Sequence, residues 1–201
     1  MTKLQMLSNL KQQCEKCNVC EIGKCRTNLV FGEGNPDSAK VVLIGEAPGE
    51  QEDKEGIPFV GKAGQFLNEY LKKANIDRKK DLYIINTIKC RPFVIKNSKT
   101  GVKSNRPPKR EEKLACEEFM LKQIEIVNPK LIILCGNNAL KALCGSKYTI
   151  TNVHGKLANL EYKGRKAVAI YHPSYLISYA HSEHKNQEFL DDLKYIKSMM
   201  D

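Results

Sequence analysis

The sequence predicts an α/β protein, a three-layer α/β/α sandwich with a central, mainly parallel four-stranded sheet. Four short apolar runs lack strict alternation, which is typical of strands buried on both faces of a parallel sheet. These runs alternate along the chain with segments of helical periodicity, as in successive βαβ units. At 201 residues the chain has the size of one compact domain, so we expect a single domain over residues 1–201.

The first predicted strand covers residues 41–45, and the other three cover residues 82–88, 131–136 and 167–171. Apolar residues recur at helical spacing from Phe66 to Ala74 and predict a helix between the first two strands. Further helices are predicted at residues 108–127, 137–143 and 189–200. The polar, Lys-rich stretch at residues 96–103 is predicted to be a surface loop.

Charge and hydropathy favour a nucleic-acid-binding protein over a membrane or secreted protein. Lys and Arg number 33 against 23 Asp and Glu, a net charge of +10, which favours a polyanionic partner such as nucleic acid. No segment approaches the roughly 20 apolar residues of a membrane span, and residues 1–13 do not resemble a secretory signal. We therefore expect a cytoplasmic protein, nucleoid-associated in a prokaryote, with no membrane partner. In a reducing compartment the eight cysteines favour metal ligands and buried thiols over disulfides.

Three motifs fall at the carboxyl ends of predicted strands, where ligands of open α/β sheets gather. The first is the Gly- and Pro-rich acidic block at residues 45–64, which contains GEAPGEQED and GIPFVGKAG. The others are NTIKCRP at residues 86–92 and HPS at residues 172–174. Alone, the first motif would indicate a connecting loop with solvated acids. Three motifs that each fall at a strand end indicate one binding site instead.

In content, order and approximate position, these motifs resemble those of the family-four uracil-DNA glycosylases, which carry an iron-sulfur cluster. The resemblance includes RTNLVFGEGNP at residues 26–36 and extends from about residue 17 to residue 174. It implies a monomeric DNA-repair enzyme that hydrolyses the N-glycosidic bond of deoxyuridine, releases uracil and leaves an abasic site in an intact strand. The implied partner is uracil-containing DNA, single- or double-stranded.

A glycosylase must hold an extruded base in a fitted pocket. The resemblance places Phe59 against the face of uracil. Asn86 offers the donor and acceptor that the O4 and N3–H edge requires, and cytosine reverses that edge. His172 is placed to bond uracil O2 and to stabilise the charge that develops as the base departs.

Further contacts are predicted around this set. Glu46, Ala47, Pro48 and Glu52 are expected in the uracil pocket, and Arg91 and Ser174 are expected to contact DNA.

The water-activating group is left open by the sequence. The best-known glycosylase branch has an Asp two residues after the Gly of the first motif, where this chain has Ala47. Glu46 and Glu52 are the remaining carboxylates, and either could stabilise an oxocarbenium-like state as well as deprotonate water. We expect Glu46 to be catalytic, together with His172, and Glu52 to form the pocket wall.

The resemblance also implies a four-iron four-sulfur cluster on four cysteines. Cys14, Cys17 and Cys20 form two overlapping Cys-x-x-Cys pairs in the Cys-rich segment at residues 14–25. The family's spacing, counted back from RTN, points to Cys17 and Cys20, with Cys90 and Cys116 as the other two ligands. Four thiolates suit zinc as well as a cluster, and only the resemblance favours the cluster.

The remaining cysteines and the spacing between ligands complete this picture. Cys135 and Cys144 are expected to be buried thiols, and Cys25 is expected to be incidental. The gap between Cys90 and Cys116 is longer than in the family pattern, so residues 93–104 are predicted to be a surface insertion.

Three other functions compete with this interpretation. A glycosylase of the same fold could act on another deaminated base such as hypoxanthine. A relative that stays covalently attached to DNA would need a basic His-containing loop that the sequence lacks. A non-enzymatic Cys-rich nucleic-acid-binding module would not need Glu46, Asn86 and His172 at three strand ends.

Overall fold

A five-stranded sheet lies at the centre of the computed structural model, which describes residues 1–97, 99–178 and 182–200. Its strands are β1 (Val41–Gly45), β2 (Leu82–Asn86), β5 (Leu131–Cys135), β6 (Leu160–Tyr162) and β7 (Arg165–Ile170). They follow the order β2-β1-β5-β7-β6; the first four run parallel, and β6 pairs antiparallel with β7. The predicted mainly parallel sheet is confirmed.

The fifth strand, β6, was not predicted. It has only three residues, and of these only Leu160 is buried, so it has neither the length nor the apolar run of a central strand. In contrast, every residue of β1, β2 and β5 is buried. Their aliphatic side chains form the centre of the core, which explains why these strands were predicted almost to the residue.

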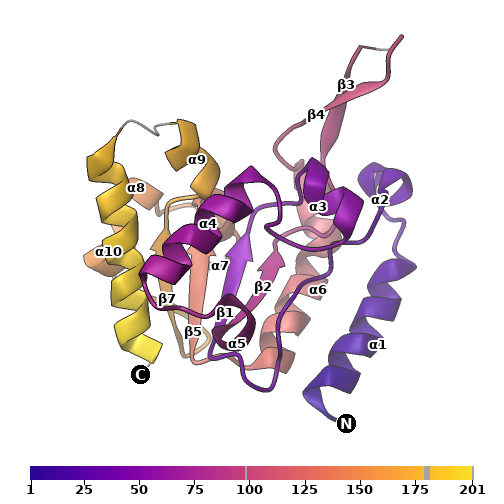
Figure 1. The fold of residues 1–201 in the computed structure, drawn as a ribbon. Coiled ribbons are helices and arrows are strands. Elements are labelled where there is room, and N and C mark those ends of the chain that lie inside the picture. The colour runs from indigo at the N-terminus through magenta and orange to yellow at the C-terminus, as the bar shows by residue number, and fades with distance from the viewer. Residues whose placement is uncertain (98, 179–181, 201) are drawn as a thin grey trace.

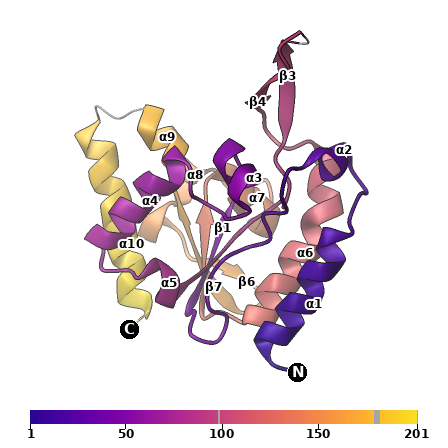
Figure 2. The same ribbon diagram turned by 45° about the vertical axis from the view of Figure 1, so that its right-hand side comes forward.

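Helices cover both faces of the sheet, as Figure 2 shows, with α4 (Lys62–Lys73) and α10 (Glu183–Met200) on one side and α1 (Lys3–Glu15) and α6 (Arg110–Val127) on the other. The three-layer sandwich is therefore confirmed. The predicted helices correspond to α4, α6, α7 (Asn137–Cys144) and α10. The shorter elements are α2 (Glu21–Cys25), α3 (Glu50–Glu55), α5 (Arg78–Asp81), α8 (Ile150–Val153), a 3-10 turn (Gly155–Leu157) and α9 (Pro173–Ser178).

Helix α1 was not predicted either, although its sequence carries a start signal. Thr2 and Gln5 form a reciprocal capping box at its first turn. Leu7, Leu10 and Cys14 recur at helical spacing and are buried, and α1 packs against α6. No helix among the described residues is long and apolar enough to span a membrane.

The prediction of a surface loop at residues 96–103 is wrong at both ends, because residues 96–97 and 102–103 belong to the strands of an antiparallel hairpin; residues 99–101 form a turn, and residue 98 lies outside the described residues. Strands β3 (Phe93–Asn97) and β4 (Val102–Asn105) form a separate two-stranded sheet with a bulge between Ile95 and Asn97. The hairpin projects from the body beside α3 (Figure 1). Its lysines gave the segment a loop-like composition, whereas its β-branched residues favour strands.

Candidate active site

A cavity of about 760 Å³ brings the three motifs together at the carboxyl ends of β1, β2 and β7. It is lined by six of the seven predicted uracil contacts and by the predicted DNA contact Ser174; the six are Glu46, Ala47, Glu52, Phe59, Asn86 and His172. Pro48 is buried and does not line the cavity. This placement agrees with the general position of ligand sites in open α/β sheets.

Asn86 lies on the cavity floor beside Gly45. The two residues are partners in the register of β1 and β2, and Asn86 is only 2% exposed. A Cβ atom on Gly45 would collide with the Asn86 Oδ1 atom and would lie 2.6 Å from the Phe59 ring. The glycine therefore lets the amide and the ring approach one another closely over the strand end. Gly45 is a site residue that the sequence analysis had included only as part of a motif.

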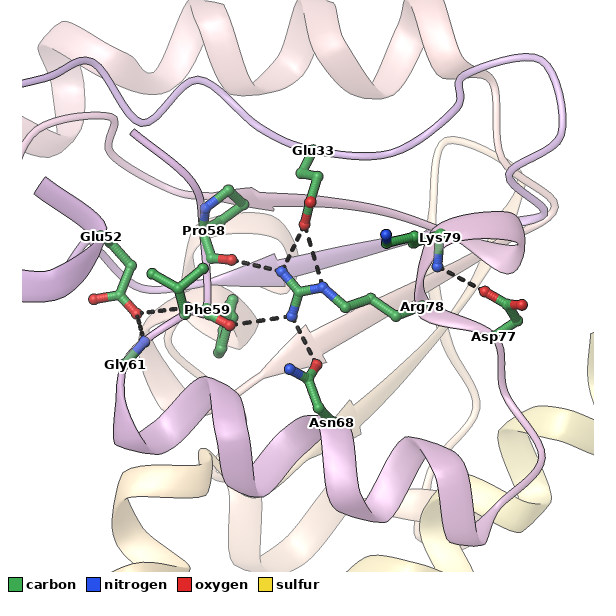
Figure 3. A network of polar contacts seen from close by, with 10 residues as sticks. Glu33, Glu52, Pro58, Phe59, Gly61, Asn68, Asp77, Arg78 and Lys79 are labelled. Atoms are coloured by element: carbon green, nitrogen blue, oxygen red, sulfur yellow. Dashed lines mark hydrogen bonds and ion pairs between the residues drawn. The ribbon is translucent and has the colours of Figure 1, made fainter. Parts of the chain in front are cut away.

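Phe59 is held in a left-handed backbone conformation, with φ of 53°, which is unfavourable for a bulky residue. Arg78, at the start of α5, donates to the carbonyl oxygens of Pro58 (2.6 Å) and Phe59 (3.1 Å) (Figure 3). The Arg78 guanidinium is itself held by Glu33 and Asn68. The sequence analysis missed Arg78, because nothing near residue 78 indicates a contact some twenty residues upstream.

Glu52 is committed to the same loop. One carboxylate oxygen accepts hydrogen bonds from the backbone N–H groups of Val60 (3.0 Å) and Gly61 (2.8 Å), and the other accepts from Gly49 (3.1 Å). Glu52 is 8% exposed. Its carboxylate thus fastens two sides of the cavity wall together, which leaves little of it available to activate water.

His172 lies opposite Phe59, with ring centroids 6.0 Å apart. The backbone N–H of Ser174 donates to His172 Nδ1 at 3.2 Å, and the Ser174 hydroxyl lies 2.7 Å from the same atom. Because a backbone N–H can only donate, Nδ1 is an acceptor, and the ring proton is on Nε2. Burial lowers the pKa of His172 to about 4, against a weaker opposing effect of Glu52. His172 is therefore a neutral donor at neutral pH.

Glu46 lines the cavity, and its carboxylate is available for catalysis. Burial raises the pKa of Glu46, and this effect is opposed by a hydrogen bond from Asn138 and by the charge of Lys113. Lys113 Nζ donates to Asn138 Oδ1 at 2.8 Å, so Lys113, Asn138 and Glu46 form a polar chain. Asn138 lies in the first turn of α7, a helix that the sequence analysis predicted without assigning Asn138 a role.

Arg91 does not line the cavity. Its side chain is 7% exposed, and it donates to Asn105 Oδ1 (2.7 Å) and contacts Glu50 (3.3 Å), two residues of the cavity lining. Arg91 thus anchors the base of the hairpin to α3, and its predicted contact with DNA stays a prediction. Asn105, Arg106 and Pro107 also line the cavity, and the sequence analysis missed them because it placed this stretch beyond the strand-end motifs.

The candidate cluster ligands gather beside the cavity rather than in it. Cys90 and Cys116 are buried in a small apolar cluster with Ile22 and Ile88, and Cys20 packs against it. Burial raises the pKa of the Cys116 thiol, the backbone and charge of Lys89 lower it, and the thiols of Cys20 and Cys17 also act on it electrostatically. The four predicted ligands therefore approach one another from three separate segments of the chain.

Cys14 belongs to a different packing environment. It is 2% exposed and packs in the main core, although it interacts electrostatically with Cys116, Cys90 and Cys17. Arg26 connects the N-terminal segment to Cys90, because its guanidinium donates to the Cys17 carbonyl (2.8 Å) and to Cys90 Sγ (3.7 Å). No group of three or more His, Cys, Asp or Glu side chains among the described residues has the geometry of a metal-ion site.

The four candidate cluster ligands, Cys17, Cys20, Cys90 and Cys116, form what we call the cysteine region. Lys89 connects this region to the cavity. Its side chain is fully buried, and its Nζ atom donates to the Asn86 carbonyl at 2.7 Å. Burial lowers the pKa of Lys89 to about 8, against the opposing effect of Cys116, Cys14 and Cys90. A cation buried among thiols favours their charged, metal-binding form. The charge of Lys89 thus favours thiolate ligands at this place, against the effect of burial, which raises the pKa of Cys90 and of Cys116.

Comparison with known proteins identifies the family. The model of the uracil DNA glycosylase superfamily matches residues 31–194. The chain is 40% identical to the type-4 uracil-DNA glycosylase of Thermotoga maritima over 200 residues, covering 99% of this chain and 97% of that protein. It is 34% identical to the type-4 enzyme of Archaeoglobus fulgidus over 199 residues, covering 96% and 92%. The chain belongs to the uracil DNA glycosylase superfamily, in its type-4 branch.

Proposed function

We propose that this protein hydrolyses the N-glycosidic bond of deoxyuridine in DNA, releasing uracil and leaving an abasic site. One observation carries the proposal: Asn86, Phe59 and His172 come from distant parts of the chain and line one cavity. This set supplies an amide, an aromatic face and a neutral donor, which are the groups that a pocket for a flipped uracil requires. The named type-4 relatives support the same activity.

Base recognition rests on Asn86 and Phe59. The Asn86 amide donates to uracil O4 and accepts from N3–H, whereas cytosine presents a donor and an acceptor in the reverse order. Phe59 stacks on the base. Because Arg78 holds the carbonyls of Pro58 and Phe59, the ring is positioned before substrate arrives.

Bond cleavage rests on charge stabilisation. As the C1′–N1 bond breaks, its electron pair moves onto uracil, and the Nε2–H group of His172 donates to O2. The sugar passes through an oxocarbenium-like state, which the Glu46 carboxylate stabilises. Water adds to C1′, and its proton passes to Glu46 or to solvent. The hydrogen bond from Asn138 and the charge of Lys113 favour the carboxylate form of Glu46, against the effect of burial on its pKa.

We assign a four-iron four-sulfur cluster to Cys17, Cys20, Cys90 and Cys116. When bound, the cluster supplies cross-linking rather than a step of the reaction. It ties the N-terminal segment to the loop after β2 and to α6. The contact between Lys89 and the Asn86 carbonyl then links this support to the base-reading residue. We expect a cytoplasmic monomer that reaches uracil in single strands or by flipping it from a duplex.

An assay with a uracil-containing oligonucleotide tests the activity. We expect free uracil in the supernatant and strand cleavage only after alkali, because hydrolysis by water leaves an abasic site in an intact strand. Matched oligonucleotides with thymine, cytosine or hypoxanthine at the same position are the controls. Strand scission without alkali by nuclease-free protein, or faster release of hypoxanthine than of uracil, would contradict the proposal.

A further inference from the structure

The β3–β4 hairpin exposes both cationic and apolar side chains next to the cavity. The segment at residues 92–110 contains no Asp or Glu, and its basic residues are Lys96, Lys99, Lys103, Arg106, Lys109 and Arg110. Ile95 is 59% exposed and Val94 is 46% exposed. Exposed apolar residues on a projecting ribbon cost solubility, and this combination with positive charge is typical of surfaces that bind nucleic acid.

The base of the hairpin is fixed to the cavity rim. Arg91 bonds Asn105 at the end of β4. Arg106 donates to the Phe93 carbonyl (3.2 Å) and pairs with Glu112 through both of its terminal nitrogens. Asn105 and Arg106 themselves line the cavity. The ribbon therefore leaves the cavity rim in a defined direction.

One face of the ribbon continues the cavity wall outward. Asn105 pairs with Phe93, and Lys103 pairs with Ile95. Because side chains alternate along a strand, these four residues share the face of Asn105. Lys103 Nζ lies 4.2 Å from the centre of the Phe93 ring, which confirms that the two residues are on the same face. Val94 lies on the opposite face.

We propose that the hairpin is a DNA-binding arm, whose cavity-side face contacts the strand flanking the nucleotide in the cavity. Lys103 on this face neutralises a phosphate, Lys96 at the bulge neutralises a second one beside the ribbon, and Ile95 packs against a neighbouring sugar or base. The interpretation of the cavity as a uracil site is the proposed function on which this inference rests. Charge complementarity and continuity with the cavity wall favour the substrate's own strand as the occupant.

Charge reversal tests the arm. Binding of an oligonucleotide carrying a non-cleavable deoxyuridine analogue is measured across a salt series. We expect Lys96→Glu/Lys103→Glu to weaken binding about tenfold and to reduce the slope of log K against log salt by about 1 to 2. The control Lys72→Glu/Lys194→Glu changes net charge equally on exposed positions of the end of α4 and of α10. Equal weakening by both double variants would overturn the proposal.

A second pair of variants tests the face. Ile95→Ser and Val94→Ser each remove a neighbouring exposed apolar side chain from opposite faces, with thermal melting as the check on folding. We expect Ile95→Ser to weaken binding several-fold and Val94→Ser to leave it unchanged. The reverse order, or no effect of either variant, would overturn the assigned face. If wild-type protein releases no uracil but the hairpin variants still weaken binding to uracil-free DNA, the proposed function is wrong, and the proposal that the hairpin binds DNA is still supported.

Discussion

The cavity and the cysteine region lie side by side but are held in different ways. In the cavity, Glu52 accepts three backbone hydrogen bonds and Arg78 donates to two carbonyls, so the chain's own groups set the geometry. Around the four candidate thiols the hydrogen bonds between described residues are fewer: Arg26 donates to Cys90, and the backbone of Lys89 bonds Cys116. The cavity should therefore tolerate the loss of one bond in a graded way, whereas the cysteine region should respond to the loss of one ligand as a unit.

The sharpest test of that difference is the pair Cys20→Ser and Cys14→Ser. Protein purified anaerobically should be brown and contain iron on Cys17, Cys20, Cys90 and Cys116. We expect Cys20→Ser to lose the colour and the iron almost completely, because cluster binding and folding are coupled. Cys14→Ser should keep both, since Cys14 packs in the main core; Cys14→Ala controls for the cost of a buried hydroxyl. Iron analysis and the visible spectrum are the measurements.

The opposite pattern would show that Cys14 and Cys17, not Cys17 and Cys20, are the ligands from the N-terminal segment. Zinc in place of iron would contradict the assignment of an iron-sulfur cluster.

Within the cavity, His172→Ala should have a large effect on chemistry and a small one on binding. A donor aimed at the departing base acts chiefly in the transition state, and losses in comparable sites are on the order of 100-fold. Single-turnover rates and DNA affinity should be measured separately. Weakened binding with an unchanged rate would make His172 a DNA contact instead.

Arg78→Ala should have a smaller effect that spreads over stability and activity. The substitution removes the hydrogen bonds from Arg78 to the carbonyls of Pro58 and Phe59, which hold Phe59 in its left-handed conformation. We therefore expect a loss of about tenfold in kcat/KM together with a lower melting temperature. The control Asn68→Ala removes only one acceptor of Arg78 and leaves both carbonyl bonds. If Asn68→Ala were as harmful as Arg78→Ala, the carbonyl bonds would not be what positions Phe59.

The smallest expected effect is on the pH dependence of stability. The pKa of His172 is lowered in the folded state to about 4, so the unfolded chain binds this proton first as pH falls. Its contribution to stability is complete above the unfolded value near 6.5 and is lost as pH falls towards 4. Between pH 7 and pH 5 we expect a loss of about 1–2 kcal/mol that His172→Gln no longer shows. Denaturant titrations at the two pH values measure it, and equal losses in both proteins would place His172 in a more hydrated environment.

The sequence predicted what depends on local pattern and missed what depends on distant contacts. β1, β2 and β5 were predictable because continuous apolar runs without alternation are typical of strands buried on both faces of a sheet, and the strand-end rule then located the cavity. The hairpin was missed because its lysines outweighed Val94 and Ile95 in composition. Arg78 was missed because its function consists of bonds to residues 58 and 59, and no local motif indicates them.

The roles of Glu46 and Glu52 also depend on contacts that the sequence does not indicate. Glu46 and Glu52 are both acidic residues of one motif, and the sequence could not assign their roles. The structure distinguishes them by their partners, because Glu52 accepts three backbone N–H groups while Glu46 has one amide partner and faces the cavity.

The most direct test of the central claim is uracil release by Asn86→Asp under single-turnover conditions, with cytosine-containing DNA of the same sequence as the second substrate. The carboxylate keeps the shape of the amide but loses the donor that reads uracil O4. We predict that most uracil release is lost while DNA binding and melting temperature stay close to those of the wild type. A buried hydrogen bond to the reacting base should be worth at least about 1 kcal/mol, several-fold in rate. A rate within about a factor of two of the wild type would contradict the account and remove Asn86 from the base-reading site.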